Sequence, residues 1–235
     1  MARSLLLISS SVVHGSGYLD HAEAEIKRHF AKTPAVTFVP YALADQEEYA
    51  ARVRTRLERM GLSVVSLHEV ADPVGAVNAA NAIFIGGGNT FRLLTLLYEK
   101  KVLAPIRKRI LGGVPYMGSS AGTNVAGPTI KTTNDMPIVY PPSFDALGLV
   151  PFQLNPHYID ADPTSKHQGE TREQRIKEFH EMNAAPVVGL REGAMLDVGD
   201  TTVILKGSAA ARLFRRGADP VEYEPGSNLD FLLSG

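Results

Sequence analysis

The sequence predicts an α/β protein in which a mostly parallel β-sheet lies between two layers of helices. Short apolar runs alternate with longer segments of helical periodicity through the first half of the chain. Most of the runs contain consecutive apolar residues rather than one at every second position, which is typical of strands buried on both faces. Glycine, proline and aspartate separate the segments, as expected at the ends of strands and helices. Together these observations favour a three-layer α/β sandwich.

Five strands and the helices between them are expected in order along this first half. The expected strands are 4–10, 35–39, 62–67, 82–85 and 114–117. The expected helices are 18–31, 45–60, a short one from 72, 91–100 and 102–111. Segment 45–60 is acidic at its start and basic later, which suits the helix dipole, and Pro73 fits the first position of a helix. The apolar residues near the N-terminus are interpreted as the first strand, because the run is too short for a signal peptide.

The second half of the chain is expected to be less regular. Residues 128–148 lack periodicity, and a loop of that length within a compact protein is usually functional or disordered. A short strand is expected at 152–154, followed by a helix that ends near 182. The runs between 187 and 214 and at 221–223 predict a β-rich C-terminal part, partly antiparallel. No repeat or linker divides the sequence, so a single domain spanning 1–235 is expected.

The composition excludes several classes of protein. Hydrophobic residues make up 44% and charged residues 21%, as in ordinary globular proteins. Lys and Arg number 24 against 25 Asp and Glu, so the net charge of -1 gives no reason to expect nucleic acid or a membrane surface as a partner. The sequence has no cysteine, which excludes disulfides, thiolate metal sites and a cysteine nucleophile. No run has the length of a membrane span, and a cytoplasmic protein is expected.

The segment Gly118-Ser119-Ser120-Ala121-Gly122 fits the G-x-S-x-G pattern of a nucleophile elbow. In such an elbow the serine occupies a sharp turn between a strand and a helix, with its hydroxyl exposed. A side chain at either glycine would collide with neighbouring backbone. The pattern is short, so Ser120 is a candidate nucleophile whose partners must come from elsewhere in the chain.

A nucleophilic serine needs a general base, and the base needs a group that orients it. His157 is the best candidate base, because it follows an apolar strand and the turn residues 155–156. The orienting acid is either Glu192, after the strand 187–190, or Asp135, in the irregular loop. Position favours Glu192, because a carboxylate on a loop is harder to hold still. Three other histidines fall on polar helical positions and are expected to be exposed: His21, His29 and His180.

Gly86-Gly87-Gly88 is a second glycine-rich stretch, between an expected strand and helix. It matches neither of the phosphate-binding patterns G-x-x-x-x-G-K-[ST] and G-x-G-x-x-G. The carboxyl ends of parallel strands meet at one edge of a sheet, so this stretch and Ser120 are expected to be close together. The predicted oxyanion hole pairs the backbone N–H of Gly88 with that of Ala121.

Five motifs in order resemble the peptidase E family of serine peptidases, which is related to cyanophycinase. They are GGGNTF at 86–91, GSSAG at 118–122, TTNDMPIV at 132–139, NPH at 155–157 and GETREQR at 169–175. The resemblance implies a flavodoxin-like fold similar to that of class I glutamine amidotransferases. It implies hydrolysis of dipeptides with an N-terminal aspartate through an acyl-enzyme, without metal or cofactor. Ser120 would be the nucleophile and His157 the base, and the family's acid has been placed at positions matching both Glu192 and Asp135.

Recognition of an N-terminal aspartate needs a cation for its side-chain carboxylate and an acceptor for its amine. Arg172 is the first choice of cation, because a guanidinium meets a carboxylate with two hydrogen bonds. Lys131 and His167 are the alternatives. Asp135 is a candidate for holding the amine, and Asn89 is a further expected substrate contact.

Three alternative functions compete with this interpretation. An α/β-hydrolase esterase would use the order Ser120, Asp135, His157, but here the acid and the histidine follow the elbow too closely. A cyanophycinase-like peptidase would share the scaffold and differ only in the pocket. A small-molecule-binding protein could retain the fold, although an intact serine, histidine and two acids argue against it. The expected substrates are small dipeptides. The loop 128–148 or a partner subunit could close the site around them, and the sequence leaves open whether the protein is a monomer or a homodimer.

Overall fold

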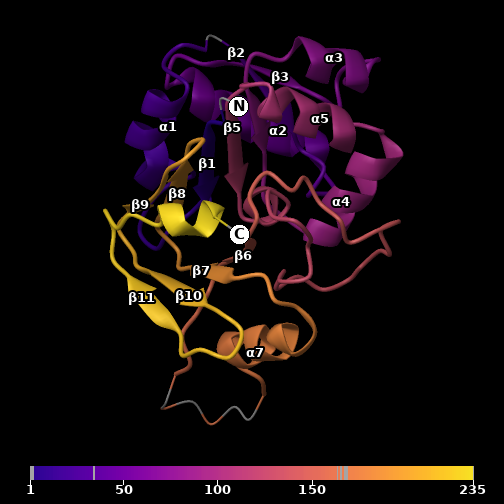
Figure 1. Cartoon of the computed structure of the whole chain (residues 1–235). Helices are drawn as coiled ribbons and strands as arrows, with labels where there is room; N and C mark the ends of the chain where they lie inside the picture. Colours follow the sequence, from indigo (N-terminus) through magenta and orange to yellow (C-terminus); the bar gives the residue numbers. More distant parts are fainter. Residues whose placement is uncertain (1–2, 34, 163, 165, 167–168, 235) are drawn as a thin grey trace.

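The computed structural model describes residues 3–33, 35–162, 164, 166 and 169–234, and these form two β-sheets. The larger sheet has the strand order β3-β2-β4-β5-β1-β8-β9 (Figure 1). Its strands are β1 (Leu5–Ile8), β2 (Ala35–Val39), β3 (Ser63–Ser66), β4 (Ile83–Ile85), β5 (Tyr116–Ser119), β8 (Ala194–Val198) and β9 (Val203–Gly207). The strands from β3 to β1 are parallel, whereas β8 and β9 each pair antiparallel with the preceding strand in that order. The predicted α/β class with a mostly parallel sheet is therefore confirmed.

Helices cover both faces of the larger sheet (Figure 1). The helices α1 (Glu23–His29) and α2 (Gln46–Glu58) pack on one face, and α3 (Pro73–Ala79), α4 (Thr90–Glu99) and α5 (Leu103–Leu111) pack on the other. Within β1, Leu6 and Ile8 join the core formed with α1 and α2, whereas Leu5 and Leu7 join the core formed with α3, α4 and α5. Successive side chains of a strand point to opposite faces, so a strand covered on both sides must be apolar at every position.

A second, smaller sheet lies beyond the carboxyl ends of the parallel strands (Figure 1). Its strands, in the order β11-β10-β7-β6, are β6 (Gln153–Pro156), β7 (Val187–Leu190), β10 (Ala211–Phe214) and β11 (Val221–Tyr223). The helix α7 (Arg172–Met182) packs on this sheet through Ile176. Strands β6 and β7 are parallel, and β10 is antiparallel to both of its neighbours, which confirms the partly antiparallel, β-rich C-terminal part.

The connection from α6 (Ala121–Asn124) to β6 contains no helix or strand in the described chain, as predicted for 128–148. An isolated bridge between Thr129 and Asp145 closes the base of this loop. Two short 3-10 helices, Asp20–Ala22 and Asp230–Leu233, complete the elements. The expected helix 18–31 is therefore divided into a 3-10 turn and the shorter α1.

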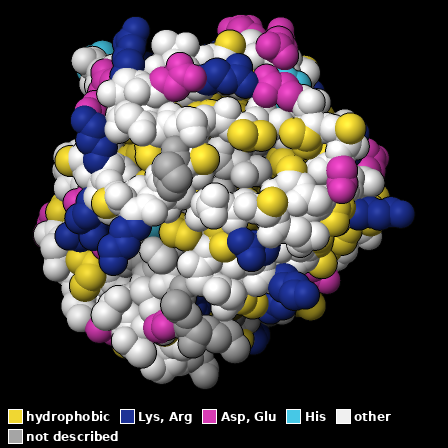
Figure 2. Space-filling model, turned by 90° about the horizontal axis from the view of Figure 1, so that it is seen from above, with side chains coloured by type: hydrophobic (Ala, Val, Ile, Leu, Met, Phe, Trp, Pro, Cys, Tyr) yellow, Lys and Arg dark blue, Asp and Glu magenta, His cyan; other side chains and the backbone are white. Residues whose placement is uncertain are grey.

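The surface carries charges of both signs. On the face shown in Figure 2, basic and acidic side chains both occur around the outline of the molecule, without one sign covering it. No helix among the residues described here has the length and apolar character needed to cross a membrane.

Candidate active site

Ser120 lies at the sharp turn between β5 and α6. Its backbone has φ 53° and ψ -111°, a conformation that costs an L-residue about 1–3 kcal/mol. The Ser120 N–H donates to the Ile8 carbonyl at 3.0 Å, and the Asn124 N–H donates to the Ser120 carbonyl at 2.9 Å. Gly122 packs so closely on β4 that an added Cβ would lie 2.0 Å from the Ile85 carbonyl oxygen. The G-x-S-x-G pattern thus corresponds to a strained, tightly packed turn.

His157 and Glu192 reach Ser120 from the second sheet. His157 directly follows β6, and its Nε2 is 2.9 Å from Ser120 Oγ. Glu192 lies just after β7, and its Oε1 is 2.8 Å from His157 Nδ1. The two residues lie side by side because β6 and β7 are parallel neighbours. Serine, histidine and carboxylate form one hydrogen-bonded chain, the arrangement that activates a serine for acyl transfer.

A buried serine at the end of β1 holds the backbone of His157. Ser9 is fully buried, and its Oγ accepts a hydrogen bond from the His157 N–H at 3.0 Å and donates one to the Leu190 carbonyl at 2.8 Å. The Tyr158 N–H donates to the same carbonyl at 3.0 Å. His157 has φ 53°, in the left-handed region, so the direction of its ring depends on these contacts. The role of Ser9 could not be predicted from the sequence, because Ser9 fell within the expected strand 4–10 and its partners His157 and Leu190 are distant in the chain.

The backbone N–H groups of Gly88 and Ala121, near Ser120, have no hydrogen-bond acceptor in the described part of the chain. Gly88 has φ 136°, and an added Cβ would meet backbone at 2.6 Å. Gly87 packs against the nucleophile, since an added Cβ there would lie 2.9 Å from Ser120 Cβ. The Gly87 N–H differs from those of Gly88 and Ala121, because it already donates to Tyr49. Burial raises the pKa of Tyr49, and hydrogen bonds that include this one oppose the rise. The geometry is consistent with the predicted oxyanion hole.

Asp135 faces the N-terminus of α4 rather than His157. Its Oδ2 accepts hydrogen bonds from the Thr90 N–H at 2.7 Å, the Thr90 hydroxyl at 2.6 Å and the Thr133 hydroxyl at 3.3 Å. The expectation that a loop carboxylate would be poorly held is wrong here, because a helix N-terminus supplies donors and a favourable dipole. The triad that an α/β-hydrolase would require, in which Asp135 hydrogen-bonds to His157, is therefore not formed in this structure.

Asn89 and Lys131 are both engaged with other parts of the protein. Asn89 caps α4, with its Oδ1 accepting from the Arg92 N–H at 3.0 Å and its Nδ2 donating to the Met136 carbonyl at 2.9 Å. Lys131 is exposed, and its Nζ lies 3.3 Å from Asn183 Oδ1. Asn89 therefore positions the loop over α4, and Lys131 does not line the pocket beside Ser120.

Arg172 is half-buried at the first position of α7. Burial lowers the pKa of Arg172 and the neighbouring Arg175 adds to this, whereas the charge of Asp135 opposes it. The guanidinium pairs with no carboxylate among the residues described. Arg172 lines a separate pocket with Asp160 and Thr171, not the pocket beside Ser120. His167 lies outside the described residues.

A small pocket beside Ser120 is formed by the elbow, the start of α4 and the irregular loop. It is lined by Thr90, Ser120, Ala121, Asn124, Thr133, Asn134, Asp135, Pro156 and His157. Asn134 Nδ2 donates to the Pro156 carbonyl at 2.8 Å, and Asn155 Nδ2 donates to Asn134 Oδ1 at 3.0 Å. These contacts tie the loop to the strand that precedes His157.

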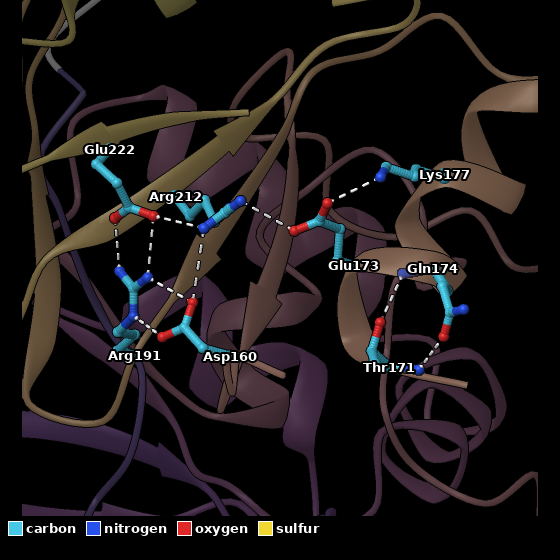
Figure 3. Close-up of polar contacts among 8 residues, drawn as sticks. All are labelled: Asp160, Thr171, Glu173, Gln174, Lys177, Arg191, Arg212 and Glu222. Atoms are coloured by element: carbon cyan, nitrogen blue, oxygen red, sulfur yellow. Dashed lines mark hydrogen bonds and ion pairs between the residues drawn. The ribbon is translucent and has the colours of Figure 1, made fainter. Parts of the chain in front are cut away.

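A cluster of charged side chains joins the segments that carry the base and the acid (Figure 3). Arg191, next to Glu192, binds Asp160 with two hydrogen bonds of 2.7 Å, and Asp160 lies just beyond His157. Arg191 also binds both carboxylate oxygens of Glu222, at 2.8 and 3.0 Å. The hydrogen bonds from Arg191 lower the pKa of Asp160. This arginine therefore fixes the backbone beside Glu192 through two carboxylates.

The same cluster extends to the start of α7 (Figure 3). Arg212 on β10 lies 3.1 Å from Glu222 and 3.0 Å from Glu173, and Glu173 in turn pairs with Lys177 at 2.8 Å. Glu173 is next to Arg172, so the charged cluster connects the segments that carry His157 and Glu192 to the start of α7. The cluster could not be predicted from the sequence, because its members are far apart along the chain and each alone resembles a solvated charge.

The histidines expected to be exposed are largely buried. His29 Nε2 lies 3.0 Å from the Tyr116 carbonyl oxygen, and burial lowers the pKa of His29 to about 4. His180 is 7% exposed, with its Nε2 3.1 Å from the Ala185 carbonyl oxygen. His21 is half-buried, and its burial lowers its pKa. Their helices are short and turn these positions toward the sheets, so the expectation was wrong.

Within the described ranges, one group of side chains could hold a metal ion, namely Glu47, His68 and Glu69. It lies beside β3, at the edge of the sheet and three strands from β5. Glu69 already binds Arg54 through both oxygens, at 2.7 and 2.8 Å. The group is remote from Ser120.

The layered α/β fold, with a serine, a histidine and a carboxylate in line at the carboxyl edge of its sheet, is typical of serine hydrolases. Residues 5–206 match the family model described as Peptidase family S51. The chain belongs to this family and is a serine-type peptidase.

Relatives are similar over nearly their whole length. Peptidase E of Streptomyces coelicolor is 53% identical over 230 residues, which cover 98% of this chain and 95% of that protein. A probable alpha-aspartyl dipeptidase of Drosophila melanogaster is 52% identical over 235 residues, with 99% and 98% covered. The crystal structure of a peptidase from an acI-B1 Actinobacterium aligns with a TM-score of 0.68 and 16% identity over 97% of each chain, which shows a shared fold. The resemblance to the peptidase E family is confirmed.

Proposed function

We propose that this chain is a dipeptidase that hydrolyses dipeptides with an N-terminal aspartate. The observation that carries the proposal is the hydrogen-bonded chain from Ser120 through His157 to Glu192, with distances of 2.9 and 2.8 Å. The substrate class is supported by the relatives named peptidase E and probable alpha-aspartyl dipeptidase.

In the proposed reaction, Ser120 Oγ attacks the carbonyl carbon of the aspartyl residue while His157 Nε2 takes its proton. The N–H groups of Gly88 and Ala121 stabilise the charge on the carbonyl oxygen, and one such donor contributes about 3–4 kcal/mol. The C–N bond then breaks, and His157 gives the proton to the leaving amine, which leaves an aspartyl ester on Ser120. Water, deprotonated by His157, cleaves the ester and releases aspartate, and the proton returns to Ser120 Oγ. Glu192 orients the imidazole and stabilises its positive charge in both steps.

Recognition of the aspartyl residue is assigned to charges at two helix starts. Arg172 is proposed to bind the side-chain carboxylate, because its guanidinium is half-buried, without a described carboxylate partner, and lies at the N-terminus of α7. Asp135, held at the N-terminus of α4, is proposed to attract the α-ammonium group. Lys131 is the second choice of cation, because its amine is already engaged with the Asn183 side chain.

The test compares hydrolysis of Asp-Leu with that of Glu-Leu, Asn-Leu, β-aspartyl-leucine and p-nitrophenyl acetate. We expect kcat/KM for Asp-Leu to exceed the others by about 100-fold or more, the discrimination expected when a wrong substrate leaves a buried polar group unpaired. Ser120→Ala is the control and should abolish turnover. Ester hydrolysis without Asp-Leu cleavage would replace the proposal with an esterase, and preferential cleavage of β-aspartyl-arginine would replace it with a cyanophycinase-like peptidase.

A further inference from the structure

We propose that Asn124 is a substrate-binding residue whose side-chain oxygen accepts a hydrogen bond from the α-ammonium group of the N-terminal residue. The inference rests on the proposed dipeptidase function and names a group that recognises the free amine. Asn124 lies one helical turn after Ser120, and its backbone N–H donates to the Ser120 carbonyl. It is among the residues that line the pocket beside the nucleophile.

The orientation of the Asn124 amide is fixed by Leu154. Asn124 Nδ2 donates to the Leu154 carbonyl at 2.7 Å. A carbonyl oxygen only accepts hydrogen bonds, so the amide cannot be turned over without losing this contact. The oxygen Oδ1 is therefore the atom that remains for the pocket.

That oxygen is a buried acceptor without a donor. Asn124 is 1% exposed, and its Oδ1 has no hydrogen-bond partner among the described residues. Most buried polar atoms in folded proteins have a partner. An unpaired acceptor in the lining of a catalytic pocket therefore indicates a place for a donor on the ligand.

The neighbouring polar side chains of the pocket already donate hydrogen bonds within the protein. The Thr90 hydroxyl lies 2.6 Å from Asp135 Oδ2, and the Thr133 hydroxyl lies 3.0 Å from the Thr90 oxygen. Asn134 Nδ2 donates to the Pro156 carbonyl. Asp135 Oδ1, by contrast, accepts no hydrogen bond from the part of the chain that is described. This end of the pocket offers acceptors and one negative charge.

These free atoms fit a primary ammonium group and oppose a carboxylate. An ammonium carries three N–H donors and a positive charge, which match Asn124 Oδ1 and the Asp135 carboxylate. The N–H groups of Gly88 and Ala121, which also lack an acceptor among the described residues, are assigned to the oxyanion hole. In an N-terminal residue the ammonium nitrogen is bonded to the α-carbon, next to the carbonyl carbon that Ser120 attacks. An internal residue has an amide in its place, so these acceptors select a free N-terminus.

The test compares the binding of L-aspartate and succinate, which has the same two carboxylates but no amine. Their dissociation constants are measured by calorimetric titration, so the result does not depend on turnover. We expect wild-type protein to bind aspartate at least tenfold more tightly than succinate. Asn124→Leu, of similar volume, should reduce this ratio at least fivefold, and Asn124→Ala serves as a second variant if the leucine variant does not fold.

Thr132→Val is the matched control. The Thr132 hydroxyl donates to the same Leu154 carbonyl at 2.8 Å, and Thr132 is buried but does not line the pocket. The valine variant loses a hydrogen bond at that carbonyl and keeps the pocket oxygen, so its ratio should equal that of wild type. A wild-type ratio near one, or an equal change in the Asn124 and Thr132 variants, would overturn the proposal. Either result, together with wild-type cleavage of Asp-Leu, leaves the dipeptidase function standing, whereas absence of that cleavage refutes the function itself.

Discussion

Replacement of Ser9 by alanine tests how the protein positions its base. The change leaves the His157 N–H, which in the wild type donates to the fully buried Ser9, without an acceptor, whereas the Leu190 carbonyl keeps its hydrogen bond from Tyr158. One unpaired buried donor costs about 1–3 kcal/mol, which corresponds to a fall in Tm of about 2–12 °C at about 2–4 °C per kcal/mol. His157 is held in a left-handed conformation, so we expect its ring to move and kcat to fall about 10- to 100-fold.

The assay combines urea unfolding with Asp-Leu kinetics, and the adjacent Ser10 supplies the control. Ser10 is also buried, at 1% exposure, but its Oγ has no hydrogen-bond partner among the described residues. Ser10→Ala breaks no hydrogen bond among the described residues, so it should lower the free energy of unfolding less than Ser9→Ala does and leave kcat unchanged. Equal kcat values and equal stabilities for the two variants would refute the role given to Ser9.

Two further predictions concern charges. Arg191→Met should lower kcat about tenfold with little change in KM, because Asp160 and Glu222 then no longer hold the backbone beside Glu192. Arg191→Lys should recover little of the lost activity, since an ammonium group cannot bind two carboxylates bidentately. Steady-state kinetics check this against Arg54→Met, a comparable exposed pair at the β3 edge that should behave as wild type. The pKa of His29 in the folded protein is about 4, below the ordinary value of 6.5. As the pH drops below 6.5 the unfolded chain therefore binds the proton first, and the folded state loses stability. At about 1.4 kcal/mol per pH unit, the loss at pH 5 is about 2 kcal/mol. Urea unfolding of His29→Gln at both pH values should show a pH dependence smaller by that amount, and an unchanged dependence would contradict the assignment.

The larger sheet and the nucleophile were predictable because their signals are local. A run such as 35–39, in which four of five residues are apolar, requires cover on both faces, and the strand β2 has the same bounds. The need for glycine at position 122 was also predictable, because α6 approaches β4 closely, as in any elbow of this kind. The elbow strand itself lies later than expected, at Tyr116–Ser119 instead of 114–117, because backbone pairing with β1 continues to the residue before Ser120.

The rest depends on contacts between residues that are distant in the chain. A short strand does not specify its neighbours, so the sequence did not indicate that β6 and β7 form a separate sheet with β10 and β11. Ser9 and His157 are separated by 148 positions, and only the folded chain brings them together. The donors that hold Asp135 come from the start of α4, which no pattern around Asp135 could indicate.

The central claim is that Glu192, and not Asp135, orients His157 behind Ser120. The most direct measurement is kcat for Asp-Leu in Glu192→Gln and Asp135→Asn. Because Glu192 contacts His157 at 2.8 Å and Asp135 contacts Thr90 instead, we expect Glu192→Gln to lower kcat by about 100-fold or more. Asp135→Asn should raise KM and keep kcat within about tenfold of wild type, since it weakens an ion pair with the substrate amine. A large loss of kcat in Asp135→Asn together with near-normal kcat in Glu192→Gln would contradict the account.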